Sequence, residues 1–234
     1  MDAASGFDAI AFDLDGTLVD SAPDIANALN AALREAGLRR FDLHTVRAWI
    51  GDGPDVLIGH ALAAQGHEHA SSASRARLRA AFDAVTLAAP LDHGVVFDGI
   101  EAVLMRLARV MPLVVVTNKP TPLATAVLAA ARLLPHLCAV HGADTPEQRK
   151  PSPLLLQAAA RRLDLPTNRM LMVGDGPADI GAARAAGCPA ALVDWGYGHA
   201  AADSSDALLW RVRSPVHLLG GVLARASDTA IAGH

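Results

Sequence analysis

Short apolar runs alternate with longer helix-like stretches along most of the chain. The stretches between the runs are rich in Ala and Leu, with Pro near the start or Gly near the end. This alternation is typical of a parallel β-sheet covered by crossover helices. The predicted strands are Ala9–Phe12, Leu113–Val116, Ala139–His141, Met170–Val173 and Ala190–Val193, and the predicted crossover helices are 121–134, 152–163 and 177–187.

The first two predicted strands are separated by a segment that is too long for a single crossover. Roughly a hundred residues lie between them, whereas a crossover connection takes about a dozen. The helical patterns in this segment cover 22–37, 43–50, 54–65 and 73–88, and no part of the insert has the pattern of a strand. We therefore expect a small helical domain inserted after the first strand.

The expected fold is α/β, a doubly wound parallel-sheet (Rossmann-like) core domain with an inserted α-helical domain. At 52% hydrophobic residues in a chain of 234, the sequence supplies enough apolar surface for such a core. The predicted division is 1–20 and 93–226 for the α/β core domain, 21–92 for the helical domain and 227–234 for a flexible tail.

Charge and composition exclude several classes of partner. The formal net charge is −4 and Lys and Arg form no run, so we expect no nucleic-acid partner and no membrane partner. The first residues have no basic signal segment and no stretch approaches the ~20 apolar residues of a bilayer span, which predicts a cytoplasmic protein. Cys138 and Cys188 lack metal-ligand spacing and are expected to be reduced packing thiols. The oligomeric state is left open.

Two pairs of acidic residues follow the ends of predicted strands. Asp13 and Asp15 stand two residues apart in extended chain, so their side chains point to the same side. Asp175 and Asp179 follow another strand, at an i, i+4 interval near the start of a helix. Because ligands of open parallel sheets collect beyond the carboxyl ends of the strands, we expect these carboxylates to share one crevice.

Such a crevice requires a cation, since several carboxylates in one place repel each other. An all-oxygen ligand set suits Mg²⁺ better than zinc. Lys150 could bring a compact positive charge to a phosphoryl group, and Thr117 and its neighbour Asn118 are candidate contacts to the phosphate oxygens. The set fits nucleophilic phosphoryl transfer, in which one carboxylate attacks phosphorus and an acid/base serves the leaving group and then water.

The segment DLDGT, from Asp13 to Thr17, resembles the first motif, DxDGT, of the haloacid dehalogenase-like (HAD) hydrolase superfamily. The other motifs follow in the same order across nearly the whole chain: VVVTN ending at Asn118, Lys150 in KPSP, and then GDGPAD with its two aspartates. In this family the helical insert is a cap domain. The resemblance therefore implies a Mg²⁺-dependent phosphomonoester hydrolase that acts through an aspartyl-phosphate intermediate.

The same resemblance implies a role for each acidic residue. Asp13 would be the nucleophile and a metal ligand. Asp15 would be the general acid/base, with its backbone carbonyl on the metal. Asp175 would be a further metal ligand and Asp179 would support the metal shell. One departure is Gly176, where relatives commonly have Ser or Thr, and its effect on the metal shell stays open.

Two further segments, RAWIGDGPDVL (47–57) and TNKP (117–120), resemble the phosphoglycolate phosphatase subfamily. That resemblance implies 2-phosphoglycolate as the substrate. Gly51 and Gly53 would then belong to a cap loop that faces the substrate, and Arg47 is a candidate for binding the substrate's carboxylate through bidentate hydrogen bonds.

Several other functions stay open. A sugar phosphomutase or a phosphatase for another small phosphorylated metabolite would use a similar core. A receiver-like phospho-aspartate signalling module would also carry a phosphorylatable aspartate, but its fold is much shorter and lacks the helical insert. A dehalogenase is disfavoured because dehalogenases of this superfamily lack the second aspartate of DxD, which here is Asp15.

Overall fold

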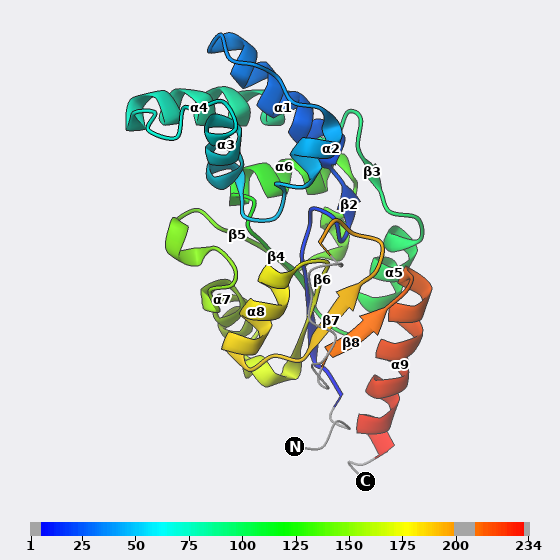
Figure 1. Ribbon diagram of the computed structural model, residues 1–234. Helices are drawn as coiled ribbons and strands as arrows, with labels where there is room; N and C mark the ends of the chain where they lie inside the picture. Colours follow the sequence, from blue (N-terminus) through cyan, green and yellow to red (C-terminus); the bar gives the residue numbers. More distant parts are fainter. Residues whose placement is uncertain (1–5, 199–208, 232–234) are drawn as a thin grey trace.

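A parallel sheet of six strands forms the centre of the computed structural model, which describes residues 6–198 and 209–231 (Figure 1). The strand order is β5-β4-β1-β6-β7-β8. Because β1 pairs with both β4 and β6, the strand order reverses at β1, and ligand crevices form at such points. The strands are β1 (Ala9–Phe12), β4 (Leu113–Thr117), β5 (Ala139–Gly142), β6 (Met170–Gly174), β7 (Ala190–Val193) and β8 (Leu209–Val212).

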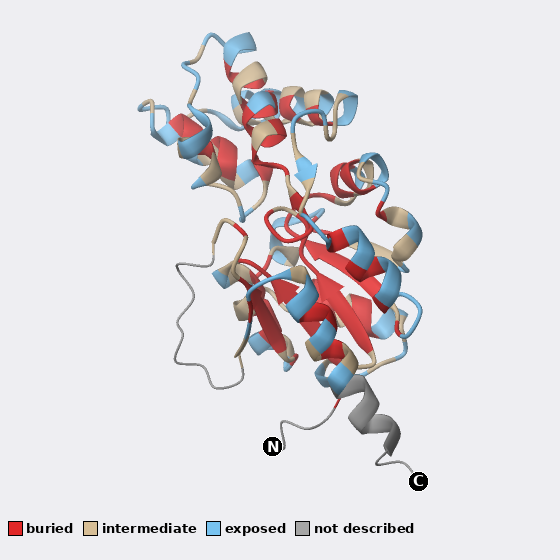
Figure 2. Ribbon diagram, turned by 90° about the vertical axis from the view of Figure 1, so that its right-hand side faces the viewer, coloured by how far each residue is buried: buried red, intermediate tan, exposed pale blue. Residues whose placement is uncertain are grey.

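The two faces of the sheet are covered by different helices, as expected for a doubly wound fold. Ile10 and Phe12 of β1 pack on one face and Ala9 and Ala11 on the other, because side chains alternate along a strand. Figure 2 shows the buried strands between helices whose outer surfaces are exposed. The first face carries α5 (Ile100–Leu107), α6 (Thr121–Ala130) and α9 (Pro215–Ile231), and the second carries α7 (Leu154–Arg162) and α8 (Pro177–Ala186).

All five predicted strands are present, and the sequence pattern missed β8, α5 and α9. The segment of β8, LWRV, has only four residues and includes the exposed Arg211, so it lacks the apolar run that marks the inner strands. The predicted helix 121–134 is divided: α6 ends at Ala130, and a 3₁₀ turn, η1 (Leu134–His136), follows. Two further 3₁₀ turns are η2 (Pro146–Gln148) and η3 (Thr167–Arg169).

The first four helices after β1 form a layer beyond one end of the sheet (Figure 1). They have a hydrophobic core of their own, which includes Leu29, Leu33, Ile58 and Phe82. Leu123 of α6 also belongs to this core and connects the layer to the sheet side of the molecule. The helices are α1 (Ala22–Glu35), α2 (Leu43–Arg47), α3 (Pro54–Ala63) and α4 (Ser72–Ala88), and we refer to them as the helical layer.

A two-stranded antiparallel ribbon joins the helical layer to the sheet. It consists of β2 (Val19–Asp20), which precedes α1, and β3 (Val95–Val96), which follows α4. The buried carboxylate of Asp24, in the first turn of α1, accepts hydrogen bonds from the backbone N–H groups of 92, 93 and 94 at 3.1, 2.9 and 2.8 Å. The side chain of Asp24 therefore holds residues 92–94, which follow the helical layer, against the first turn of α1.

One expectation concerns the C-terminal end of the chain. The boundary expected at 227 lies inside α9, which continues to Ile231, and residues 1–5 and 232–234 lie outside the described part. Within the described residues, no helix combines the length and the apolar character needed to cross a lipid bilayer.

Candidate active site

Lys150 connects two of the predicted site carboxylates. Its Nζ lies 2.7 Å from Oδ1 of Asp13, which follows β1, and 2.6 Å from Oδ1 of Asp179, in the first turn of α8. The third hydrogen bond of the ammonium goes to the carbonyl oxygen of Val116 at 3.0 Å. Only 3% of Lys150 is exposed, so all three of its donors are satisfied inside the protein.

Three buried carboxylates come together beside Lys150. Asp13, Asp175 and Asp179 each offer a ligand oxygen, and these atoms lie within 4.8 Å of one another. Three carboxylates facing one ammonium leave a formal excess of two negative charges in a buried space. An all-oxygen donor set with this excess fits a hard divalent cation, so the residues present match a metal site.

Burial shifts the protonation of these groups toward their uncharged forms. Burial, together with the negative charge of Asp179, raises the pKa of Asp13 to about 6 against the opposing charge of Lys150. The pKa values of Asp175 and Asp179 are also raised, mainly by burial. Burial alone would lower the pKa of Lys150, but the charges of Asp13 and Asp179 outweigh it and the net shift is upward. The charge of Lys150 therefore does not offset the burial of the three carboxylates, and a divalent cation would favour their charged forms.

Backbone donors fix the orientation of Asp175, which lies in the loop between β6 and α8. Its Oδ2 accepts hydrogen bonds from the N–H groups of Tyr197 and Gly198 at 2.6 and 3.1 Å, and Thr17 donates to its Oδ1 at 3.3 Å. Gly16 has a φ of +89°, and a Cβ on it would lie 2.5 Å from Oδ2 of Asp175. The glycine of the DxDGT motif is thus required both by the backbone conformation and by the close approach of this carboxylate.

Asp15 has a cationic partner, Lys119, that was not predicted from the sequence. Nζ of Lys119 lies 2.8 and 3.0 Å from the two carboxylate oxygens of Asp15, and Ser21 donates a hydrogen bond to the same group. Lys119 is 6% exposed. Each aspartate of the DxD motif therefore contacts a lysine, Asp13 with Lys150 and Asp15 with Lys119.

Thr117 and Asn118 lie at the end of β4, as predicted, but their side chains are held by protein groups. Oγ1 of Thr117 accepts a hydrogen bond from the backbone N–H of Lys119 at 3.2 Å. Oδ1 of Asn118 accepts the N–H of Lys150 at 2.7 Å, and its Nδ2 donates to the carbonyl oxygens of Gly51 and Lys150 at 2.8 and 3.2 Å. Asn118 therefore links the loop of Lys150 to the helical layer.

A small cavity lies between the helical layer and the end of the sheet. Its volume is about 40 Å³, room for about three water molecules. Polar side chains line it from the sheet side, and mostly apolar side chains line it from the helical layer. The lining residues are Asp13, Asp15, Thr117, Asn118, Lys119 and Leu123 from the sheet side, and Ile25, Trp49, Ile50, Gly51, Gly53, Pro54, Leu57 and Phe82 from the layer.

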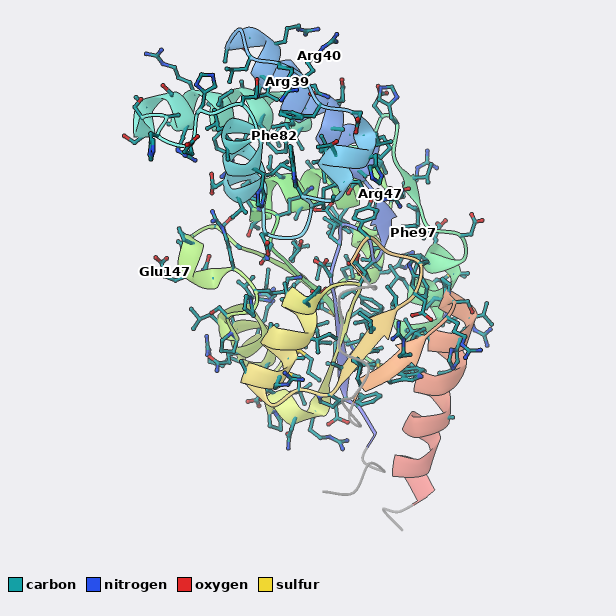
Figure 3. All side chains as sticks on the ribbon, in the orientation of Figure 1. Arg39, Arg40, Arg47, Phe82, Phe97 and Glu147 are labelled. Atoms are coloured by element: carbon teal, nitrogen blue, oxygen red, sulfur yellow. The ribbon has the colours of Figure 1, made fainter. Side chains whose placement is uncertain are left out.

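Two predicted positions have surroundings that differ from the other site residues. Arg47, labelled in Figure 3, is not among the described residues that line the cavity: its guanidinium stacks over the ring of Tyr197 at 4.6 Å and lies 3.9 Å from Asp20. Gly176 donates its backbone N–H to Oδ2 of Asp179 at 3.0 Å.

Comparison with known proteins gives a consistent picture. The family model of the haloacid dehalogenase-like hydrolases matches residues 7–187. Curated relatives include the phosphoglycolate phosphatases of Rhodospirillum rubrum, 41% identical over 194 residues (81% of this chain and 80% of that protein), and Yersinia pseudotuberculosis, 38% identical over 191 residues (81% and 82%). The crystal structure of a predicted phosphoglycolate phosphatase from Haemophilus somnus superposes with a TM-score of 0.83 at 29% identity, covering 92% of this chain and 97% of that one. The chain belongs to the haloacid dehalogenase-like hydrolases.

Proposed function

We propose that this protein is a Mg²⁺-dependent phosphomonoester hydrolase, and specifically a phosphoglycolate phosphatase. The observation that carries the proposal is the position of Asp13, a buried carboxylate that lines the cavity and is held by Lys150. Asp15 lines the same cavity, and we assign it the acid/base role. The names of the curated relatives support 2-phosphoglycolate as the substrate.

In this proposal one oxygen of Asp13 attacks the substrate's phosphorus and the ester oxygen leaves, so that the phosphoryl group is carried on Asp13. Asp15 donates a proton to the departing oxygen and later accepts one from the water that attacks the phosphorus. Lys150 neutralises charge and keeps Asp13 oriented. Asp13, Asp175 and Asp179 are the residues that would hold Mg²⁺, which supplies positive charge for the phosphoryl oxygens.

We further propose that the helical layer, residues 21–92, is a cap domain that covers the reacting groups. The apolar lining contributed by Ile25, Trp49 and Phe82 supports exclusion of bulk water during the reaction.

Phosphate release from a panel of substrates tests this function. The purified protein would be incubated with 2-phosphoglycolate, a hexose phosphate, a nucleoside monophosphate and a chromogenic phosphomonoester, with MgCl₂ or with EDTA. The proposal predicts repeated turnover with Mg²⁺, the highest kcat/KM for 2-phosphoglycolate and loss of activity in EDTA. Conversion of a hexose phosphate to its isomer without phosphate release would identify a phosphomutase instead, and a single labelling of the protein without turnover would identify a signalling module.

A further inference from the structure

The chain contains only two lysines among its 20 basic Lys and Arg residues, and both are buried in the candidate active site. Every other basic position of this kind is an arginine. Lys150 forms ion pairs with Asp13 and Asp179, whereas Lys119 forms an ion pair with Asp15. A lysine at 6% exposure has lost most of its hydration, so its position needs a partner and points to a specific use of the compact ammonium.

Lys119 is also the one cationic side chain among the described residues that line the cavity. Lys150 is not among them, and the helical layer contributes mostly apolar groups such as Trp49, Leu57 and Phe82. An anionic group of a substrate, other than the phosphate, would therefore lose its hydration on entry, and among the described lining residues Lys119 is the side chain that offers it a positive partner. Burying a carboxylate without such a partner is strongly unfavourable.

The chemistry of the proposed reaction places a substrate carboxylate close to this lysine. Asp15 must reach the ester oxygen that leaves, and Lys119 contacts both carboxylate oxygens of Asp15. In a 2-phospho-hydroxyacid the carboxylate is attached to the carbon that carries the ester oxygen. A group so close to the leaving oxygen lies close to Asp15 and hence within reach of the flexible side chain of Lys119.

We propose that Lys119 is the specificity-determining residue that binds the substrate's carboxylate and thereby selects short phosphorylated hydroxyacids over phosphomonoesters that have no carboxylate. The inference rests on the proposed function. In the absence of substrate, Asp15 keeps the ammonium paired. When substrate binds, Lys119 contacts the substrate's carboxylate. Arg47, which the sequence suggested for this task, stacks on Tyr197 and is 42% exposed in its side chain.

A pair of substrates that differ only in the carboxylate tests this assignment. 2-Phosphoglycolate and ethyl phosphate share the O–CH₂ unit, and ethyl phosphate has a methyl group in place of the carboxylate. The readout is the ratio of kcat/KM for the two compounds, which cancels any general loss of activity in a variant. The variants are Lys119→Met and, for comparison, Arg47→Met. We expect the ratio to fall by about 30-fold or more in Lys119→Met, since a charge-assisted contact in a buried site is lost, and to stay near the wild-type value in Arg47→Met.

Three outcomes separate the possible errors. A wild-type protein that does not prefer 2-phosphoglycolate over ethyl phosphate would overturn the proposed substrate itself. A wild-type preference that Lys119→Met retains would overturn the role of Lys119 alone and leave a residue that only positions Asp15. Loss of the preference in Arg47→Met, with Lys119→Met unchanged, would assign the carboxylate to Arg47.

Binding without turnover covers the case in which Lys119→Met is too slow to assay. In an Asp13→Asn background, calorimetric titration with each compound in the presence of Mg²⁺ measures the two dissociation constants. Addition of Lys119→Met should weaken 2-phosphoglycolate binding by about 30-fold or more and change ethyl phosphate binding much less. Equal weakening for both compounds would contradict the assignment.

Discussion

The ammonium of Lys150 lies 2.7 Å from the carboxylate of Asp13, and neither group has appreciable contact with solvent. The contact joins the end of β1 to a loop that precedes α7, two segments that are far apart in the chain. Because the same ammonium contacts Asp179, one lysine sets the relative positions of a proposed nucleophile and a proposed metal-site carboxylate. We therefore expect the loss of Lys150 to affect both stability and activity.

Removing Lys150 should harm activity and stability together. In Lys150→Met the carboxylates of Asp13 and Asp179 lose their positive partner inside the protein. We expect kcat to fall by about 100-fold or more, and the free energy of unfolding without metal to fall by roughly 3 kcal/mol. Urea denaturation in EDTA and in MgCl₂ measures the second effect. Unchanged stability in EDTA would contradict the buried contact.

The raised pKa of Asp13 predicts an unusual pH dependence of the metal-free protein. Asp13 has a pKa of about 6 in the folded chain, against an ordinary value of 3.8, so between these values the folded state holds a proton that the unfolded state has lost. The stabilisation from this proton is complete below pH 3.8 and is lost as the pH rises through 6. The free energy of unfolding in EDTA should fall by about 1 kcal/mol between pH 5 and pH 7.5.

Two comparisons assign this pH effect to Asp13. Asp13→Asn has no carboxyl group to titrate and should lack this part of the decline. MgCl₂ should also remove it, because a bound cation favours the charged carboxylate. An equal decline in EDTA and in MgCl₂, in both proteins, would assign the pH dependence to other groups.

The ribbon between the sheet and the helical layer should depend on Asp24. Asp24→Asn removes one carboxylate oxygen as an acceptor, so at least one of three buried N–H groups at 92–94 loses its partner. We expect a loss of about 2 kcal/mol in the free energy of unfolding and faster hydrogen exchange at these amides. The matched control is Asp92→Asn, an exposed side chain in the same segment, which should change stability by less than about 0.5 kcal/mol. Equal effects in the two variants would contradict the role of Asp24.

A side chain at Gly53 should disturb the contact between the helical layer and the loop after β4. A Cβ there would lie 2.8 Å from the carbonyl oxygen of Asn118, whereas a Cβ on Gly51 would meet no atom within 4 Å. Both glycines have positive φ, 85° and 138°, so alanine strains the backbone at either position. Gly53→Ala should therefore reduce kcat/KM by about tenfold more than Gly51→Ala. Equal activity in the two variants would show that activity does not depend on the close contact between Gly53 and the carbonyl oxygen of Asn118.

Sequence patterns predicted the inner part of the fold and failed at its edges. The strands next to β1 are continuous apolar runs because both of their faces are buried, and this makes them visible in the sequence. The edge strand β8 and the two-residue strands β2 and β3 have no such run. They become strands through hydrogen-bonded pairing with a neighbouring strand in the folded chain. The helices of the layer were recognisable because each has an apolar side that packs into a common core.

The candidate site was predictable where residues belong to an ordered motif and hidden where tertiary structure creates the contact. The order of the motifs singled out Asp13, Lys150 and Asp179, and in the structure Lys150 donates hydrogen bonds to both aspartates. Lys119 was missed because a lysine after a strand is usually a surface residue. The scarcity of lysine in the chain was a signal that could have identified it. Nothing local marks Asp24, which has the sequence context of an ordinary first-turn acid.

Phosphate release by Asp13→Asn tests the central claim most directly. Asparagine keeps the shape of the side chain but cannot carry the phosphoryl group through a carboxylate oxygen. With 2-phosphoglycolate and saturating MgCl₂, the wild-type protein should release phosphate over many turnovers, and the variant should show less than about 0.1% of that rate. A folded Asp13→Asn protein that released phosphate at a rate comparable to wild type would contradict the assignment of Asp13 as the nucleophile.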